Sequence, residues 1–228
     1  MAIKYDTVVP WGRSYEEYVF MFDLNERDLG KSILGCGDGP ASFNCIMNKN
    51  GRKVTSVDII YQFTAAEIEQ RINETFDIVI TQTRNNSDKF IWTKIKDINE
   101  LGSIRLSAMK EFLNDYEKGK TEGRYIFAEM PGLPFNDNNF DLALSSHFLF
   151  LHSDNLSLDF HLKSIAEMLR TAKEVRIFPL LDVNGNESPY VETVMNVYKE
   201  KGYSAERSKV DYEFQIGGNK MLVIKRDC

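Results

Sequence analysis

The sequence is poor in the residues that build metal sites, disulfide frameworks and membrane spans. Its 228 residues include three histidines and three cysteines, Cys36, Cys45 and Cys228. Neither set has the close spacing of a metal site, and an odd number of cysteines argues against a disulfide framework. No apolar run approaches the roughly 20 residues that a membrane-spanning helix needs, and residues 1–6 lack the apolar core of a signal peptide. We therefore expect a cytoplasmic protein with no metal and no membrane partner.

The sequence also lacks a cluster of positive charge. The net charge is −6, and lysines are mixed with acids in segments such as 94–97 and 116–120. Proteins that hold a long nucleic acid need clustered Lys and Arg to displace counterions. A large nucleic-acid partner is therefore disfavoured and a small-molecule partner is favoured. The apolar fraction of 43% is ordinary for a globular protein, and the length predicts a single domain over residues 1–228.

The sequence does contain a glycine-rich turn, and the apolar run that follows this turn ends in an acidic residue. The letters ILGCGDGP carry three glycines at alternate positions, Gly35, Gly37 and Gly39, before a segment that can be helical. Glycine lets a backbone turn sharply and lets a ligand come close. The next apolar run ends at Asp58, where a carboxylate at the end of a strand can accept hydrogen bonds from a ribose diol. The pair predicts a nucleoside-binding corner in an open α/β sheet.

The spacing of the glycines distinguishes between nucleoside ligands. A dinucleotide site has the pattern G-x-G-x-x-G, whereas here the third position after Gly37 is Pro40. A structural turn without a ligand is the plain alternative. The letters LGCGDG resemble the first motif of the class I S-adenosylmethionine-dependent methyltransferases.

Two further segments resemble the same family in the expected order. The letters EMPGLPFNDNNFD begin at Glu129, and a helix-and-strand segment spans 166–178. The resemblance implies that Glu129 accepts from the adenine amino group and that the Met130 N–H donates to the ring. It also implies that a fourth strand, ending at Ser145, runs past the cofactor. One of Ile59 or Ile60 would pack on the adenine face.

The resemblance implies a fold, a cofactor and a set of residues that line it. The fold is α/β, a three-layer Rossmann-like methyltransferase sheet, mostly parallel with a C-terminal antiparallel hairpin. The cofactor is S-adenosylmethionine. The residues that the resemblance and the turn place around the cofactor are Gly35, Cys36, Gly37, Gly39, Asp58, Ile59, Glu129, Met130 and Ser145.

Two departures from the family pattern stand out. Ile33 occupies the position, two residues before the first motif glycine, where the family usually has an acid. One polar support of the cofactor is therefore missing or comes from elsewhere. In addition, Lys173 and Glu174 replace the usual Gly-Gly before the fifth strand, which is a minor change in a turn.

The remaining segments predict additions to a minimal sheet domain. Ser14 is placed to cap a helix over 14–24. Residues 61–124 form a mostly helical insertion, in which Thr64 and Glu67 make a capping box. Such an insertion can be a lid over the site or a decoration without contact to it. The C-terminal hairpin pairs 203–214 with 220–225, joined by a glycine-rich turn.

Two polar residues are candidates for chemistry or for cofactor binding outside the motifs. His147 follows the fourth strand, and an imidazole there can accept a proton from the acceptor or hydrogen-bond a loop carbonyl. His152 and His161 are weaker candidates. Arg13, beside Trp11 and a glycine, can pair with the methionyl carboxylate of the cofactor.

The function that these residues and the resemblance indicate is transfer of a methyl group from S-adenosylmethionine to an unidentified acceptor, with His147 nearest the reacting atom. One alternative is a non-catalytic S-adenosylmethionine sensor or a supporting subunit, which Ile33 in place of the acid keeps open. A nicotinamide-dependent oxidoreductase is less favoured, because Pro40 breaks the dinucleotide pattern. The sequence indicates neither the methylated atom nor the oligomeric state.

Overall fold

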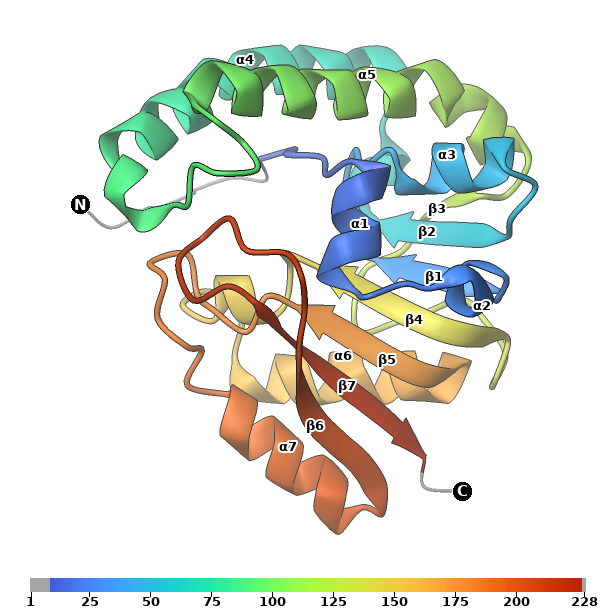
Figure 1. Cartoon of the computed structure of the whole chain (residues 1–228). Helices are drawn as coiled ribbons and strands as arrows, with labels where there is room; N and C mark the ends of the chain where they lie inside the picture. Colours follow the sequence, from blue (N-terminus) through green and yellow to red (C-terminus); the bar gives the residue numbers. More distant parts are fainter. Residues whose placement is uncertain (1–8, 227–228) are drawn as a thin grey trace.

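A computed structural model describes residues 9–226 of the chain (Figure 1). Cys228 and residues 1–6, which entered the expectations about cysteines and a leader segment, lie outside this range. Within residues 9–226 no helix is long and apolar enough to cross a membrane.

The centre of the molecule is a seven-stranded sheet in the order β3-β2-β1-β4-β5-β7-β6. The first five strands of this order are parallel, and β7 is antiparallel to both β5 and β6. The predicted sheet, mostly parallel with a C-terminal antiparallel hairpin, is confirmed. The strands are β1 (Ile33–Cys36), β2 (Val54–Asp58), β3 (Tyr125–Phe127), β4 (Phe140–Ser146), β5 (Ala172–Phe178), β6 (Tyr203–Lys209) and β7 (Lys220–Arg226).

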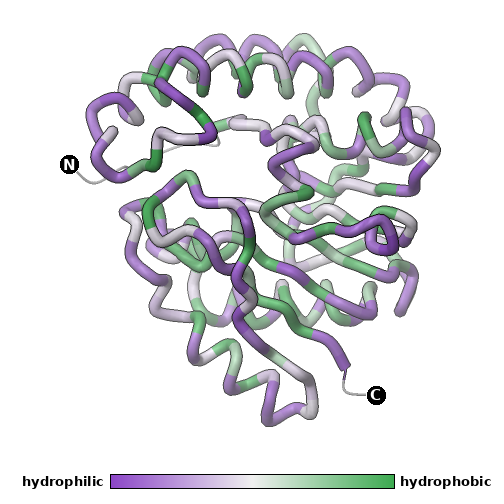
Figure 2. Tube along the Cα trace, viewed as in Figure 1, coloured by the Kyte–Doolittle hydropathy of each residue, from purple (hydrophilic) through white to green (hydrophobic). Residues whose placement is uncertain are grey.

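Helices cover both faces of the sheet and give three layers (Figure 1). One buried cluster packs α6 and α7 against the sheet, and a second packs α1 and α3 against the opposite face. Figure 2 shows the central strands mostly in the hydrophobic colour, as expected for strands that are buried on both faces. The helices are α1 (Tyr15–Met21), α2 (Glu26–Leu29), α3 (Phe43–Lys49), α4 (Ala65–Asn85), α5 (Ile98–Thr121), α6 (Leu158–Thr171) and α7 (Val191–Glu200), with short 3-10 turns η1 (Ile59–Gln62), η2 (Ser87–Lys89) and η3 (Phe150–His152).

The insertion between β2 and β3 consists mainly of the helix pair α4 and α5. The Ser14 and Thr64 capping boxes that the sequence predicts are both present. Ile68, Ile72 and Val79 recur at helical spacing on the buried stripe of α4. Tyr116 of α5 ties the pair to the segment that follows β2, because its hydroxyl lies 3.0 Å from the Tyr61 carbonyl of η1 and 2.9 Å from the Phe63 carbonyl, and can donate to either.

The tip of the insertion is joined to the C-terminal hairpin loop. The Ile91 N–H donates to the Phe214 carbonyl at 2.7 Å, and the Ile216 N–H donates to the Lys89 carbonyl at 3.0 Å. The Phe90 and Phe214 rings stack with centroids 4.8 Å apart. The prediction that a strand runs over 203–214 is therefore wrong at its end: β6 stops at Lys209. The backbone of 214–216 pairs with the insertion rather than with β7.

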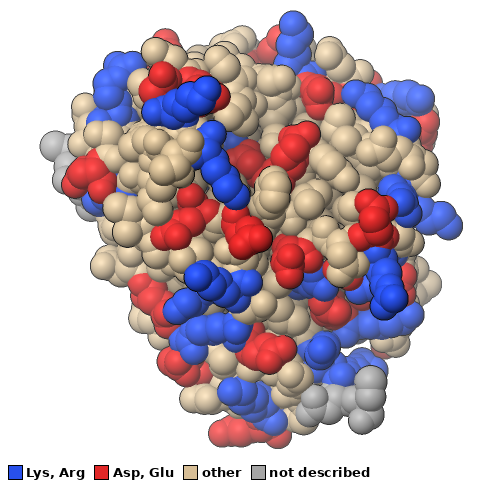
Figure 3. All heavy atoms as spheres, in the orientation of Figure 1, with Lys and Arg blue, Asp and Glu red and all other residues tan. Residues whose placement is uncertain are grey.

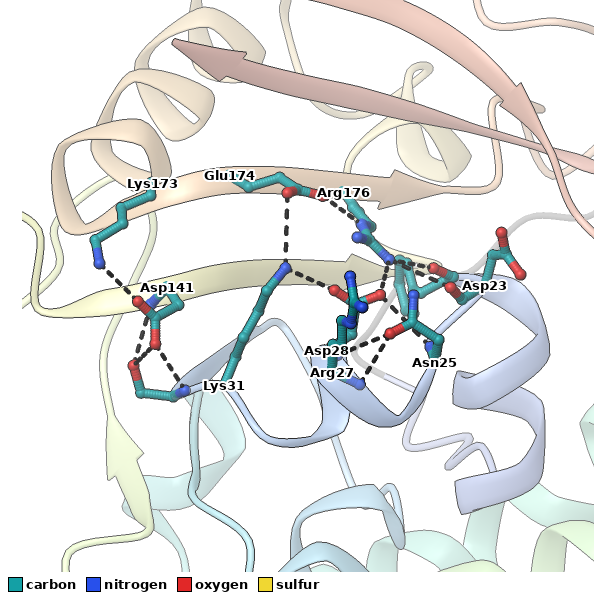
Figure 4. Close-up of polar contacts among 11 residues, drawn as sticks. Asp23, Asn25, Arg27, Asp28, Lys31, Asp141, Lys173, Glu174 and Arg176 are labelled. Carbon is teal, nitrogen blue, oxygen red and sulfur yellow. Dashed lines mark hydrogen bonds and ion pairs between the residues drawn. The ribbon is translucent and has the colours of Figure 1, made fainter. Parts of the chain in front are cut away.

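An ion-pair network ties the short helix α2 to the sheet (Figure 4). Arg176 of β5 donates to the Phe22 carbonyl at 2.7 Å and to the Asp28 carboxylate at 3.3 Å. Lys31 reaches the other oxygen of Asp28 at 2.6 Å. Because Arg176 and Asp28 are buried, these contacts fix the segment that leads from α1 into β1.

A second buried ion pair joins α1, α5 and the hairpin loop. Arg105 donates through two guanidinium nitrogens to both oxygens of Glu17, one of them at 2.6 Å, and the Tyr212 hydroxyl donates to Glu17 at 2.7 Å. Burial alone would raise the pKa of Glu17, but Arg105 and then Arg13 outweigh it and hold that pKa at about 2. The carboxylate is therefore charged at neutral pH and depends on its cationic partner.

Removing one partner of this pair should cost much more stability than removing both. Arg105→Met leaves the Glu17 charge buried without its partner, and we expect a loss of about 3–5 kcal/mol in the free energy of unfolding. The double variant Glu17→Gln with Arg105→Met should regain most of that loss. Urea unfolding of wild type, the single variants Glu17→Gln and Arg105→Met, and the double variant measures the coupling between the two residues. Equal losses in the single and double variants would contradict it.

Candidate active site

A cavity of about 370 Å³ lies at the carboxyl ends of β1, β2 and β4. Open α/β sheets bind ligands at this edge. The walls of the cavity come from six parts of the chain. They are residues 9–13 except Gly12, Tyr18 of α1, the turn 37–40, residues 58–60, Val79 of α4, and the segment 146–156 in part. The insertion thus contributes to the cavity wall, which the decoration alternative did not predict.

The glycines of the turn are required by its geometry. Gly37 and Gly39 have φ angles of 69° and 56°, in the left-handed region that favours glycine. A Cβ on Gly35 would lie 1.8 Å from the Asp38 carboxylate. The turn is therefore built to fold an acidic side chain back beneath its own backbone.

Asp38 is a site residue that the sequence analysis missed. Its carboxylate accepts hydrogen bonds from the Tyr18 hydroxyl at 2.9 Å and from the Ser56 hydroxyl at 2.6 Å, and it lines the cavity. Burial raises its pKa to about 6, although Ser56 and Tyr18 act in the opposite direction. An acid is thus present at the turn although Ile33 stands where the family usually has one. The position inside the glycine motif was the available signal.

Asp58 lies on the same wall and is held by the backbone around it. One oxygen accepts from the Gly39 N–H at 2.8 Å and the other from the Ile60 N–H at 2.9 Å. Burial raises its pKa, opposed by these backbone hydrogen bonds. The turn after β1 and the end of β2 are therefore locked together by one carboxylate. Each of its oxygens has a second lone pair to offer a ligand.

His147 lies on the cavity wall in a constrained conformation. Its φ angle is 52°, its backbone N–H donates to the Phe178 carbonyl at 2.7 Å, and its imidazole Nδ1 lies 2.9 Å from the Ser146 hydroxyl. Burial lowers its pKa well below the usual value, and Arg13 and Arg105 lower it further. The imidazole is therefore neutral at pH 7 and is a weaker proton acceptor than an ordinary histidine.

Arg13 presents a cation to the same cavity. One guanidinium nitrogen donates to the Trp11 carbonyl at 3.2 Å, while its Nε is buried without a hydrogen-bond partner. Burial, and then the charge of Arg105, lower its pKa to about 10. A guanidinium in this state favours an incoming anion.

Other predicted site residues lie close by but do not line the cavity. Gly35 and Cys36 belong to β1, and Ser145 is fully buried in β4 with no partner for its hydroxyl. Asp58 is in register with Phe127, so Glu129 and Met130 follow the neighbouring strand by two and three residues. Ile59, 37% exposed, does line the cavity.

The three histidines have different positions. His152 of η3 lines the cavity, shortly after the fourth strand. His161 is buried in α6, where its ring stacks on Phe150. Among residues 9–226 no group of His, Cys, Asp and Glu side chains is arranged to hold a metal ion.

Comparison with known proteins places the chain in a family. No protein-family model matches it. Over 222 residues it is 37% identical to the uncharacterized protein MJ0045 of Methanocaldococcus jannaschii, and the match covers 97% of both chains. The chain belongs to the family of MJ0045.

Solved structures with a similar course of the chain have low sequence identity to it. The TehB-like S-adenosylmethionine-dependent methyltransferase of Corynebacterium glutamicum is 13% identical with a TM-score of 0.49, over 94% of this chain and 88% of that one. The PH0226 protein of Pyrococcus horikoshii is 11% identical with a TM-score of 0.49, over 93% and 91%.

Asp38 should make the protein less stable as the pH rises. Its pKa is 3.8 in the unfolded chain and about 6 in the fold, so between these values the folded protein binds more protons. The free energy of unfolding should therefore fall as the pH rises from about 4 to 6. Asp38→Asn removes this effect, since the Tyr18 and Ser56 hydroxyls can rotate to suit an amide.

We expect Asp38→Asn to be more stable than wild type by about 1–3 kcal/mol at pH 7.5, with the difference vanishing near pH 3.5. Chemical unfolding at both pH values measures it. A variant that is less stable than wild type at pH 7.5 would show that the carboxylate is needed in its charged form.

Proposed function

We propose that the protein transfers a methyl group from S-adenosylmethionine to a small acceptor. The observation that carries this proposal is the hydrogen bond between the glycine turn and the Asp58 carboxylate. A carboxylate at the end of β2, fixed by the Gly39 N–H on the cavity wall, is suited to bind a ribose diol. The motif G-x-G-x-G, with Pro40 closing the turn, supports a nucleoside rather than a dinucleotide.

The residues around the cavity fit the chemical parts of this cofactor. Asp58 would accept from the ribose hydroxyls, and Ile59 would pack on the adenine ring near Glu129 and Met130. Arg13 would pair with the methionyl carboxylate and Asp38 would lie toward the methionyl ammonium. Each assignment matches a charge or hydrogen-bonding group of the cofactor with an opposite or complementary one in the cavity wall.

When bound, the cofactor supplies a methyl group that is already activated, because its leaving group is a neutral thioether. The chain then has to position an acceptor and exclude water. The insertion and the hairpin loop support the second task, since they meet above the sheet through the contacts of Ile91 and Ile216. His147 would touch the acceptor as a neutral hydrogen-bonding group.

A small acceptor in the cytoplasm is part of this proposal. The net charge is −6, and Lys and Arg are interspersed with Asp and Glu on the face shown in Figure 3. Mixed charges of this kind do not provide the continuous positive track that a long nucleic acid needs. A cavity bounded by an insertion also favours a molecule small enough to be enclosed.

A non-catalytic S-adenosylmethionine sensor is the second candidate. The observation that favours it is the neutral, partly enclosed His147, because its lowered pKa makes it a poor proton acceptor for an incoming substrate. A sensor would bind the cofactor and never consume it. The two candidates therefore differ in turnover and share the same binding site.

Calorimetric titration of the purified protein tests the shared part of the proposal. We expect S-adenosylmethionine and S-adenosylhomocysteine to bind with micromolar dissociation constants and NADH not to bind. Binding of NADH in preference to both sulfur nucleosides would overturn the assignment. Formation of S-adenosylhomocysteine with added metabolite pools then separates an enzyme from a sensor.

Substitution of Asp58 should weaken cofactor binding in two steps. Asp58→Ala removes hydrogen bonds to a charged acceptor, each worth about 1.5–3 kcal/mol, so affinity for S-adenosylmethionine should fall at least tenfold. Asp58→Asn keeps one acceptor oxygen, so its affinity for S-adenosylmethionine should lie between those of wild type and Asp58→Ala. Val183→Ala is a control, because Val183 does not line this cavity. Unchanged affinity in Asp58→Ala would place the ribose elsewhere.

A further inference from the structure

A second, smaller cavity of about 110 Å³ adjoins the first. The two share Arg13 and His147 in their walls, together with Trp11, Val79 and Leu151. The rest of the second cavity comes from the insertion, from the segment after β5 and from the hairpin loop. A molecule seated there would meet a cofactor bound in the first cavity at the shared wall.

The walls of the second cavity are rich in aromatic rings. Phe90 comes from the insertion, Phe178 from the end of β5, and Tyr212 and Phe214 from the hairpin loop. The Phe90 and Phe214 rings stack on each other, and the Phe178 and Tyr212 rings meet edge to face. Such walls fit a planar ring, and the volume suits a single ring better than a fused system.

The same cavity carries an excess of positive charge. Its titratable wall residues are Arg13, Arg105, His147 and Tyr212. His147 is neutral, and burial together with the Glu17 carboxylate raises the pKa of Tyr212, which keeps the phenol neutral. The positive charges of two guanidinium groups are thus opposed by the charge of one carboxylate, that of Glu17.

The two cations also have unused hydrogen-bonding capacity. Arg105 is 0% exposed, and its Nε has no hydrogen-bond partner. The Nε of Arg13 is buried and unpartnered as well. Buried donors without partners are costly and are usually satisfied by another group, which a ligand with acceptor oxygens can supply.

We propose that the second cavity is the acceptor subsite and takes a single-ring aromatic anion, methylated at its anionic oxygen. This rests on the proposed function, because the cofactor brings an ammonium, a sulfonium and one carboxylate. Its carboxylate would pair with Arg13, but its net charge is positive, so its binding leaves the region around Arg13 and Arg105 with an excess of positive charge. An anionic acceptor offsets that charge, and a neutral or cationic one does not.

The transfer step balances without a base. A lone pair of the anionic oxygen forms the bond to the methyl carbon, the carbon–sulfur bond breaks, and its electron pair stays on sulfur. An anion and a sulfonium become a neutral ether or ester and a neutral thioether, and no proton leaves. This agrees with a neutral His147, which donates or accepts a hydrogen bond but need not take up a proton.

Calorimetry with three single-ring probes of similar size and different charge tests the charge preference of the second cavity. The full chain, saturated with S-adenosylhomocysteine, is titrated with benzoate, benzamide and benzylamine. We expect benzoate to bind at least tenfold more tightly than benzamide, and benzylamine more weakly still. Equal or tighter binding of benzamide or benzylamine would overturn the proposal, as would the failure of all three to bind.

A pair of variants tests whether the aromatic anion binds in the second cavity. Val183 lines the second cavity and not the first, whereas its neighbour Asn184 lines neither. Val183→Trp should weaken benzoate binding at least tenfold and leave S-adenosylhomocysteine binding unchanged, and Asn184→Trp should change neither. Benzoate binding that survives Val183→Trp would place the anion elsewhere.

The same titrations separate this proposal from the cofactor assignment. Bound nucleoside with no benzoate preference refutes the acceptor class alone. If S-adenosylhomocysteine does not bind, the cofactor assignment fails. The benzoate and benzamide titrations of the free protein then still decide whether the cavity selects an anion.

Discussion

The buried contact among Glu17, Arg105 and Tyr212 holds together the parts of the protein that do not belong to the sheet. Glu17 is on α1, Arg105 on α5 and Tyr212 on the hairpin loop. Of these elements, α1 lines the first cavity through Tyr18, and α5 and the hairpin loop line the second. A carboxylate with three buried donors fixes their relative positions more closely than apolar packing would, because each hydrogen bond has a required direction. The site depends on this contact although Glu17 lines neither cavity.

The same contact also sets the electrostatics of the site. Glu17 neutralises one of the two guanidinium groups, so the region keeps one uncompensated positive charge next to His147. Burial, and then the charge of the two guanidinium groups, lower the pKa of His147 and keep the imidazole neutral. The same positive charge makes the region attractive to anions. A single ion pair therefore links stability, the protonation state of a candidate contact residue and the preferred charge of the acceptor.

Much of the sheet, and the meeting of the glycine turn with Asp58 at its edge, could be predicted from the sequence, because these features rest on short-range signals. The glycine spacing, Asp58 and the capping residues Ser14 and Thr64 act within a few residues of their targets. The role of Asp38 was harder to see, since its burial depends on Tyr18 and Ser56, which lie elsewhere in the chain. The early end of β6 was missed because the backbone of 214–216 pairs with residues 89–91, a contact that no local pattern reveals.

The buried contact of Glu17 with Arg105 and Tyr212 has a consequence for how the chain folds. Tyr212 lies 195 positions after its partner Glu17, and Arg105 lies 88 positions after it. Contacts between such distant positions form late, because a long loop must close before they can contribute. During synthesis the cavities therefore stay open until the hairpin loop has emerged. The aromatic rings of the second cavity are then left in water, and transiently exposed apolar surface of this kind favours aggregation of the incomplete chain.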